Sequence, residues 1–182
     1  RKGAFEKATS LLQIYLDSNP DDAYARGQLA LAYENTQLIH ESIEEFTQVL
    51  LIEPENEWAL LKRAHLFHYY QKNMPLALVD YGQYLLLKPM DSKILVARGQ
   101  VKHLLFDLAG ALTDFNQAIQ IDKKDAGYLA KRGQLYCTLE KYDQSLEDFN
   151  QAINLDKTSG WIYSSRGFLH FLLKQNDLAQ ED

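Results

Sequence analysis

The sequence predicts an all-α fold in which helical hairpins stack side by side as a solenoid. Three observations predict it. One segment recurs nearly unchanged after 34 residues, as LTDFNQAIQID (112–122) and LEDFNQAINLD (146–156), and apolar residues follow a helical spacing within each copy. No segment alternates polar and apolar residues as a strand does. Two helices of about 13 residues cannot bury their apolar faces alone, so neighbouring hairpins must pack together.

The small residues of the chain set the phase of the repeat. The shift of 34 carries Gly99 onto Gly133 and Gly167, and Ala30 onto Ala64, whereas the shift from Ala64 to Gly99 is 35. One residue has therefore been inserted between those two positions. This phase divides the chain into a half repeat (1–22), four full repeats (23–56, 57–91, 92–125 and 126–159) and a truncated repeat (160–182).

Each full repeat is predicted to contain two amphipathic helices. In 126–159, Leu129, Gly133 and Tyr136 share the face of a first helix, and a second helix follows a break near Lys141. Asp125 stands where an N-cap is needed.

Prolines and the inserted residue mark the predicted turns. Pro20 and Pro54 lie at the exit from a second helix, as does Pro89. In 57–91 we expect the inserted residue in the turn Lys72–Pro75, because Pro75 suits the first turn of the second helix.

These hairpins resemble the tetratricopeptide repeat. The small residues at position 8 of each unit are Ala30, Ala64, Gly99, Gly133 and Gly167, those at position 20 are Ala8, Ser42, Ala77, Ala111, Ser145 and Ala179, and the aromatic residues at position 24 are Phe46, Tyr81, Phe115 and Phe149. The resemblance covers the whole chain. It implies a right-handed α-α superhelix whose concave face, formed by the first helix of each hairpin, binds peptides or helices of partner proteins.

Opposite charges recur at matched positions of the repeat. Arginine stands at position 7 of four units and aspartate just before position 24, as Arg63, Arg98, Arg132 and Arg166 with Asp80, Asp114, Asp148 and Asp182. We expect each pair to join the two helices of its hairpin, with two hydrogen bonds per pair. The first full repeat has Leu29 and Glu45 at these positions.

Composition excludes several classes of protein. Among 182 residues, 46% are hydrophobic, the formal net charge is −6 and one cysteine is present. Lone Cys137 excludes an internal disulfide or a multi-cysteine metal cage, and we expect an intracellular, cytoplasmic location. No apolar run approaches the about 18 residues of a membrane span. The acidic balance, concentrated in 23–56, argues against binding to nucleic acid.

No catalytic pattern is found, so we expect a protein that is not an enzyme and has no cofactor. The glycines form no phosphate-binding loop, and His40-Glu41 lacks the second histidine of a metalloprotease helix. His65, His68 and His103 could approach one another in stacked hairpins, but no acid or cysteine completes a metal site. We expect groove or surface histidines and no bound metal.

The first-helix positions predict the partner-binding groove. The candidate residues are Trp58, Leu61, Lys62, His65, His68, Tyr69, Lys93, Gln100, His103, Lys131 and Gln134. Aromatic side chains are favoured at interface hot spots, and three lysines accompany them, so we expect an acidic, partly apolar segment of a partner protein. For Trp58 the alternative is packing against the preceding hairpin.

Family members that hold the C-terminal carboxylate of a chaperone do so with Lys at position 5 and Asn at position 9 of one unit. Here the corresponding pairs are Gly27 with Leu31, Leu61 with His65, and Val96 with Gln100. The usual carboxylate clamp is therefore absent, and we do not expect this partner.

The sequence thus predicts a scaffold or adaptor for protein–protein interaction in complex assembly. Two alternatives remain: a substrate-recruiting arm of a larger enzyme whose catalytic domain lies outside this segment, and a self-association module. Because both ends fall within a repeat, we expect the segment to belong to a longer array.

Overall fold

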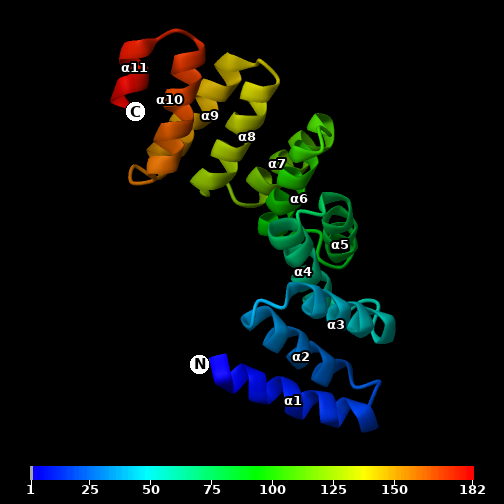
Figure 1. The fold of residues 1–182 in the computed structure, drawn as a ribbon. Coiled ribbons are helices and arrows are strands. Elements are labelled where there is room, and N and C mark those ends of the chain that lie inside the picture. The colour runs from blue at the N-terminus through cyan, green and yellow to red at the C-terminus, as the bar shows by residue number, and fades with distance from the viewer. Residues whose placement is uncertain (1) are drawn as a thin grey trace. The chain divides into compact units, whose positions relative to one another are not determined.

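The computed structural model describes residues 2–182, which form helices joined by short turns and contain no β-strand (Figure 1). The chain divides into two compact units, Arg1–Pro89 and Met90–Asp182.

The first unit contains five α-helices, one of which continues as a π-helical turn. They are α1 (Lys2–Ser18), α2 (Ala23–Asn35), α3 (Ile39–Ile52), α4 (Glu57–His65) with its continuation η1 (Leu66–Gln71), and α5 (Met74–Leu87). Each helix packs on the next along the chain.

The second unit contains six helices. They are α6 (Ser92–Leu104), α7 (Leu108–Ile121), α8 (Ala126–Thr138), α9 (Tyr142–Leu155), α10 (Gly160–Leu172) and α11 (Asn176–Glu181). Beyond its sequence neighbours, α8 contacts both α6 and α10, which are the first helices of the adjoining hairpins. These three helices therefore form one layer, and its exposed side is called the first-helix face.

Side-chain caps start the first helix of each complete hairpin. Asp22, Asn56, Asp91 and Asp125 each accept a hydrogen bond from a backbone N–H in the first helical turn. Such a bond satisfies a donor that the helix itself leaves unpaired. The predicted cap at Asp125 is confirmed.

Small residues stand where the two helices of a hairpin cross. The Ser42 hydroxyl donates to the Ala30 carbonyl at 2.8 Å, and the Ser145 hydroxyl donates to the Gly133 carbonyl at 2.7 Å. Both serines are completely buried. The backbones approach so closely that a side chain at one helix reaches the main chain of the other.

The predicted arginine–aspartate pairs are confirmed. Arg132 donates to both oxygens of Asp148 at 2.8 and 2.7 Å. The same two-bond geometry joins Arg63 to Asp80, Arg98 to Asp114 and Arg166 to Asp182. In the hairpin 23–56, Leu29 stands in place of the arginine. Arg26, which lies one helical turn before Leu29, contacts Glu45 at 2.9 Å.

A third bond from the same arginine joins neighbouring hairpins. Arg132 Nη1 donates to Asn116 on α7 at 2.8 Å, and Arg63 Nη1 donates to Thr47 on α3 at 3.0 Å. One guanidinium thus connects three helices of a unit.

The extra residue of 57–91 lies within a helix and not in the turn, so its predicted place at Lys72–Pro75 is wrong. In the other hairpins the carbonyl of the residue at position 11 accepts a hydrogen bond from the backbone N–H five residues later, as Lys102 does from Asp107. In 57–91 the carbonyl of Phe67 accepts instead from Asn73, six residues later. The π-helical turn Leu66–Gln71 takes up the additional residue. The turn itself keeps the form of the others, with left-handed Lys72 like left-handed Phe106.

Candidate functional site

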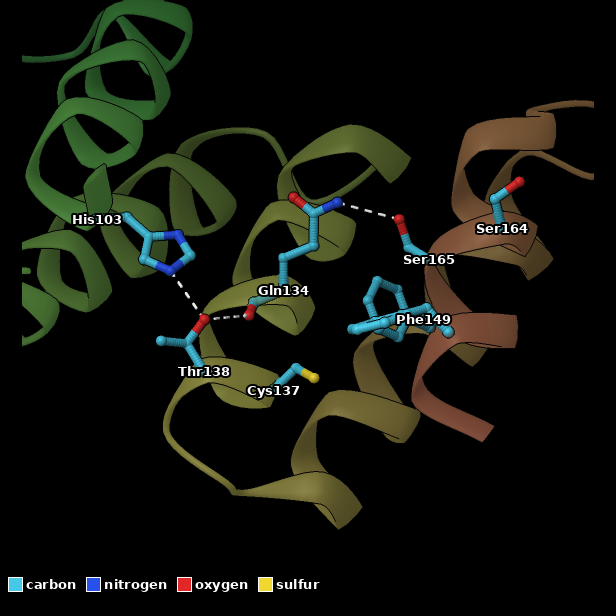
Figure 2. A pocket seen from close by; sticks show the side chains of 8 residues that line it. His103, Gln134, Cys137, Thr138, Phe149, Ser164 and Ser165 are labelled. Carbon is cyan, nitrogen blue, oxygen red and sulfur yellow. Dashed lines mark hydrogen bonds between the residues drawn. The ribbon is translucent and has the colours of Figure 1, made fainter. Parts of the chain in front are cut away.

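A pocket of about 420 Å³ lies on the first-helix face (Figure 2). Its side chains come from α6, α8, α9 and α10 of the second unit. They are His103, Gln134, Cys137, Thr138, Phe149, Ser164, Ser165 and Phe168.

Hydrogen bonds between α6, α8 and α10 hold the polar rim of the pocket in place. Gln134 Nε2 donates to Ser165 Oγ at 3.0 Å, and His103 Nε2 lies 2.9 Å from Thr138 Oγ1 (Figure 2). Because the Thr138 hydroxyl donates to the Gln134 carbonyl at 3.2 Å, its oxygen is left to accept from His103. The rim is therefore preorganised before any partner arrives.

The floor of the pocket is apolar. Phe149 is buried, Cys137 is partly buried, and Phe168 has 59% of its surface exposed. Burial raises the pKa of the Cys137 thiol, which lowers the fraction of thiolate and so disfavours nucleophilic chemistry. The arrangement suits the binding of an apolar side chain.

A lysine stands beside the pocket. Lys131 Nζ lies 3.5 Å from Gln134 Oε1 and 5.0 Å from the centre of the Trp161 ring. Burial lowers the pKa of Lys131. Burial, and then the charge of Lys131, lower the pKa of His103. A neutral imidazole and an ammonium group therefore border the same part of the face.

In the first unit, Trp58 packs against the preceding hairpin and also remains partly exposed. Its ring fills the space beside Gly27 and meets Phe46 edge-on with centroids 5.2 Å apart, yet 39% of the residue is accessible. The predicted packing of Trp58 against the preceding hairpin is confirmed, and its role in partner binding stays a prediction that the exposed part of the ring permits.

The charge of Lys62 is compensated within the first unit. Lys62 Nζ lies 3.1 Å from Glu34 Oε2, and both side chains are half-buried. Leu61 beside it is also half-buried. The positive charge that the sequence predicts for this part of the groove is thus already paired.

The expectation that His68 lines an open groove is wrong. His68 is buried, stacks on Tyr69 with centroids 4.1 Å apart, and places Nδ1 3.3 Å from the Tyr81 hydroxyl. It lies in the π-helical turn, where the extra residue changes the direction of the side chains that follow. Tyr69 is exposed, and half-buried His65 packs against both tyrosines.

The structure brings together only some of the predicted groove residues. His103 and Gln134 line the pocket, and Lys131 adjoins it, whereas Gln100 is half-buried elsewhere on α6 and Lys93 is exposed near its start.

Other lining residues were absent from the predicted set: Cys137, Thr138, Ser164, Ser165 and Phe168. Positions 5, 6 and 9 of the unit, which are Leu61, Lys62 and His65 in 57–91, are the last three of these residues in 160–182.

Two further observations concern residues 2–182. No three His, Cys, Asp or Glu side chains lie close enough together there to hold a metal ion. None of the helices in this range has the length and apolar character needed to span a bilayer.

Comparison with family models and solved structures agrees with this architecture. A tetratricopeptide repeat model matches residues 23–56, and a TPR repeat model matches residues 133–174. A tetratricopeptide repeat protein from Parabacteroides merdae is 22% identical with a TM-score of 0.88, over 99% of this chain and 71% of that one. No curated protein matches the sequence.

Two further solved structures share the fold. MamA from Desulfovibrio magneticus is 18% identical with a TM-score of 0.77, over 87% of this chain and 89% of that one. YrrB, described as a TPR protein with an unusual peptide-binding site, is 14% identical with a TM-score of 0.73, over 93% of this chain and 87% of that one.

The stacked hairpins define a helical-repeat protein. The predicted all-α solenoid fold class is confirmed. The chain contains tetratricopeptide repeats, matched at residues 23–56 and 133–174. These repeats and this fold are those of a protein-interaction scaffold.

Proposed function

We propose that the exposed sides of the first helices of the hairpins bind a peptide or helical segment of a partner protein. The pocket beside Gln134 carries the proposal. Its volume, about 420 Å³, falls within the range of about 300–1,000 Å³ that is typical of ligand sites. An apolar floor with a few fixed polar groups at the rim is the composition expected of such a site.

A large apolar side chain of the partner is the natural anchor for this pocket. It would lie against Phe149 and Phe168, and its backbone would pass the Ser164 and Gln134 side chains at the rim. Because Gln134 and Ser165 are already hydrogen-bonded to each other, little side-chain entropy is lost on binding.

The first unit supports the same function with exposed aromatic side chains. Trp58 and Tyr69 both retain accessible surface on the first helix of their hairpin. Aromatic residues dominate the binding energy of many protein interfaces. We infer that they form a second contact region for a partner.

The lysines support an acidic group in the partner. The expected location of this group differs from the sequence prediction. Lys93 is exposed and Lys131 borders the pocket, whereas Lys62 is paired with Glu34. The second unit is therefore the better location for acidic groups. YrrB, a TPR protein described as having an unusual peptide-binding site, is a precedent on this fold.

Selection from a displayed random-peptide library against the purified chain tests the proposal. Selected peptides should bind Phe168→Ala about tenfold more weakly, since loss of a hot-spot side chain costs more than about 1 kcal/mol. Asn154→Ala, an exposed change on α9, is the matched control and should leave the affinity unchanged. Peptides that bind Phe168→Ala and Gln134→Ala as tightly as the unchanged protein would contradict the pocket as the binding site.

A further inference from the structure

Two lysines at equivalent places in their hairpins have different partners. Lys62 precedes the small residue Ala64 by two residues, and Lys131 precedes Gly133 by two. On the preceding first helix, Glu34 follows Ala30 by four residues. The residue equivalent to Glu34 in the second unit is His103, which follows Gly99 by four residues.

In the first unit the lysine at this place is paired with a glutamate of the preceding first helix. Lys62 Nζ contacts both oxygens of Glu34, at 3.1 and 3.5 Å. The two side chains are 31% and 24% exposed, so the ion pair is partly withdrawn from water. A carboxylate from the neighbouring first helix therefore compensates the lysine.

The second unit lacks this carboxylate. Among residues 2–182, Lys131 has no ion pair, and its ammonium group meets only the uncharged Gln134 amide and the Trp161 ring. Burial alone is responsible for the lowered pKa of Lys131, since no acid opposes it. A half-buried charge without a counter-charge is unfavourable, and an incoming anion would relieve it.

We propose that the second unit binds a carboxylate of a partner segment at Lys131, in the place equivalent to that of Glu34 beside Lys62, while the adjacent bulky apolar side chain of the segment enters the pocket. This inference rests on the proposed function. It narrows the partner to a protein segment in which an acidic residue neighbours a large apolar one.

Gln134 places the two parts of this site next to each other. Its Oε1 faces Lys131 Nζ at 3.5 Å, and its Nε2 donates to Ser165 at the pocket rim at 3.0 Å. A carboxylate on one side of Gln134 and an apolar side chain on the other are therefore separated by a single side chain. Neighbouring residues of one peptide can supply both.

The Trp161 ring prepares the lysine for such a ligand. The ring faces the ammonium group and restricts its position by cation–π attraction. His103 cannot replace the missing acid, because imidazole is either neutral or positively charged. The counter-charge is thus left to the partner.

Fluorescence anisotropy with defined peptides tests this inference on the intact chain. The probes are fluorescein-labelled peptides with blocked ends that carry Phe or Leu next to Asp, and matched peptides with Asn in place of Asp. We expect the Asn peptides to bind about tenfold more weakly, as for the loss of a hydrogen bond to a charged group. A third peptide, with Asn and a free C-terminus, distinguishes a terminal carboxylate from a side-chain one.

Variants assign the effect to Lys131. Lys131→Gln should remove the preference for Asp over Asn, and Lys131→Arg should retain it. Lys62→Gln is the matched control and should leave the preference intact, because Lys62 is paired with Glu34. His103→Glu should weaken binding of the Asp peptide by supplying the missing acid within the chain.

The outcomes separate the inference from the proposed function. Equal binding of Asp and Asn peptides that is still lost in Phe168→Ala overturns the carboxylate site and leaves the peptide pocket standing. A preference for Asp that persists in Lys131→Gln overturns the assignment to this lysine. A peptide in the pocket should also slow the reaction of Cys137 with a thiol reagent, because Cys137 lines the pocket. If no peptide binds and no peptide slows this reaction, both proposals fail.

Discussion

The guanidinium of Arg132 lies edge-on to the carboxylate of Asp148, with N···O distances of 2.8 and 2.7 Å, and joins the first and second helices of one hairpin. Asp148 is almost fully buried, whereas Arg132 retains some contact with water. The hydrogen bonds to Asp148 raise the pKa of Arg132. Arg132 therefore stays charged while the pair stabilises the helix crossing.

Removal of the aspartate charge should destabilise this hairpin. Asp148→Asn leaves the Arg132 guanidinium beside a neutral amide, and we expect the free energy of unfolding to fall by about 3 kcal/mol. Urea unfolding followed by circular dichroism measures the change. Asp143→Asn, at an exposed position in the first turn of α9, is the control, and an equal loss in both variants would contradict the role of the pair.

The bond between neighbouring hairpins should contribute less. Asn116→Ala removes one acceptor from Arg132 but leaves both bonds to Asp148, so we expect a loss of about 1 kcal/mol. A double-mutant cycle with Asp148→Asn measures the coupling through the shared guanidinium. Strict additivity of the two changes would show that the guanidinium does not link the three helices energetically.

Two glycines at equivalent helix crossings should differ in their tolerance of alanine. A Cβ on Gly99 would lie 2.7 Å from Phe115 Cε1, whereas a Cβ on Gly133 would lie 3.1 Å from Phe149 Cε1. We expect Gly99→Ala to cost about 1–3 kcal/mol through overpacking. For Gly133→Ala, a smaller clash is offset by a helix-propensity gain of about 1 kcal/mol.

Thermal unfolding of the two alanine variants provides the comparison. Ala30 and Ala64 occupy the same position in other hairpins, so the position accepts a methyl group where the facing ring leaves room. A melting temperature for Gly99→Ala at or above that of Gly133→Ala would contradict the predicted order.

Stability of the first unit should depend on pH through half-buried His65 and buried His68. Burial lowers the pKa of His65 and of His68. The unfolded chain, with histidine pKa values near about 6.5, therefore binds more protons below that pH than the native state does. The unfolding free energy should be fully developed above about pH 6.5 and should decrease as the pH falls below it.

His68→Gln tests the histidine contribution. The Tyr81 hydroxyl can donate to His68 Nδ1 only while that nitrogen carries no proton, and a glutamine oxygen can accept the same bond without titrating. The decrease in urea midpoint between pH 7.5 and 5.5 should be smaller in this variant. His40→Gln, at an exposed position of α3, should keep the full decrease, and identical profiles for both variants would contradict the assignment.

The candidate site shows how far repeat spacing alone can reach. His103, Lys131 and Gln134 were predicted from their positions in the repeat, and the structure places them at or beside one pocket. Spacing identifies which residues share a face but not which of them already have partners. For that reason it predicted an available charge on Lys62 and an open position for His68.

What the sequence by itself determined was the hairpin and its repetition, because helical periodicity, small residues at the crossing and matched Arg and Asp positions are all local or regularly spaced features. Only the tertiary structure decided where the inserted residue of 57–91 is accommodated, since a π-helical turn and a longer loop have the same length in sequence. It also decided that Glu34 compensates Lys62 while nothing equivalent compensates Lys131. Those outcomes depend on side chains from different helices meeting in space, which no single segment encodes.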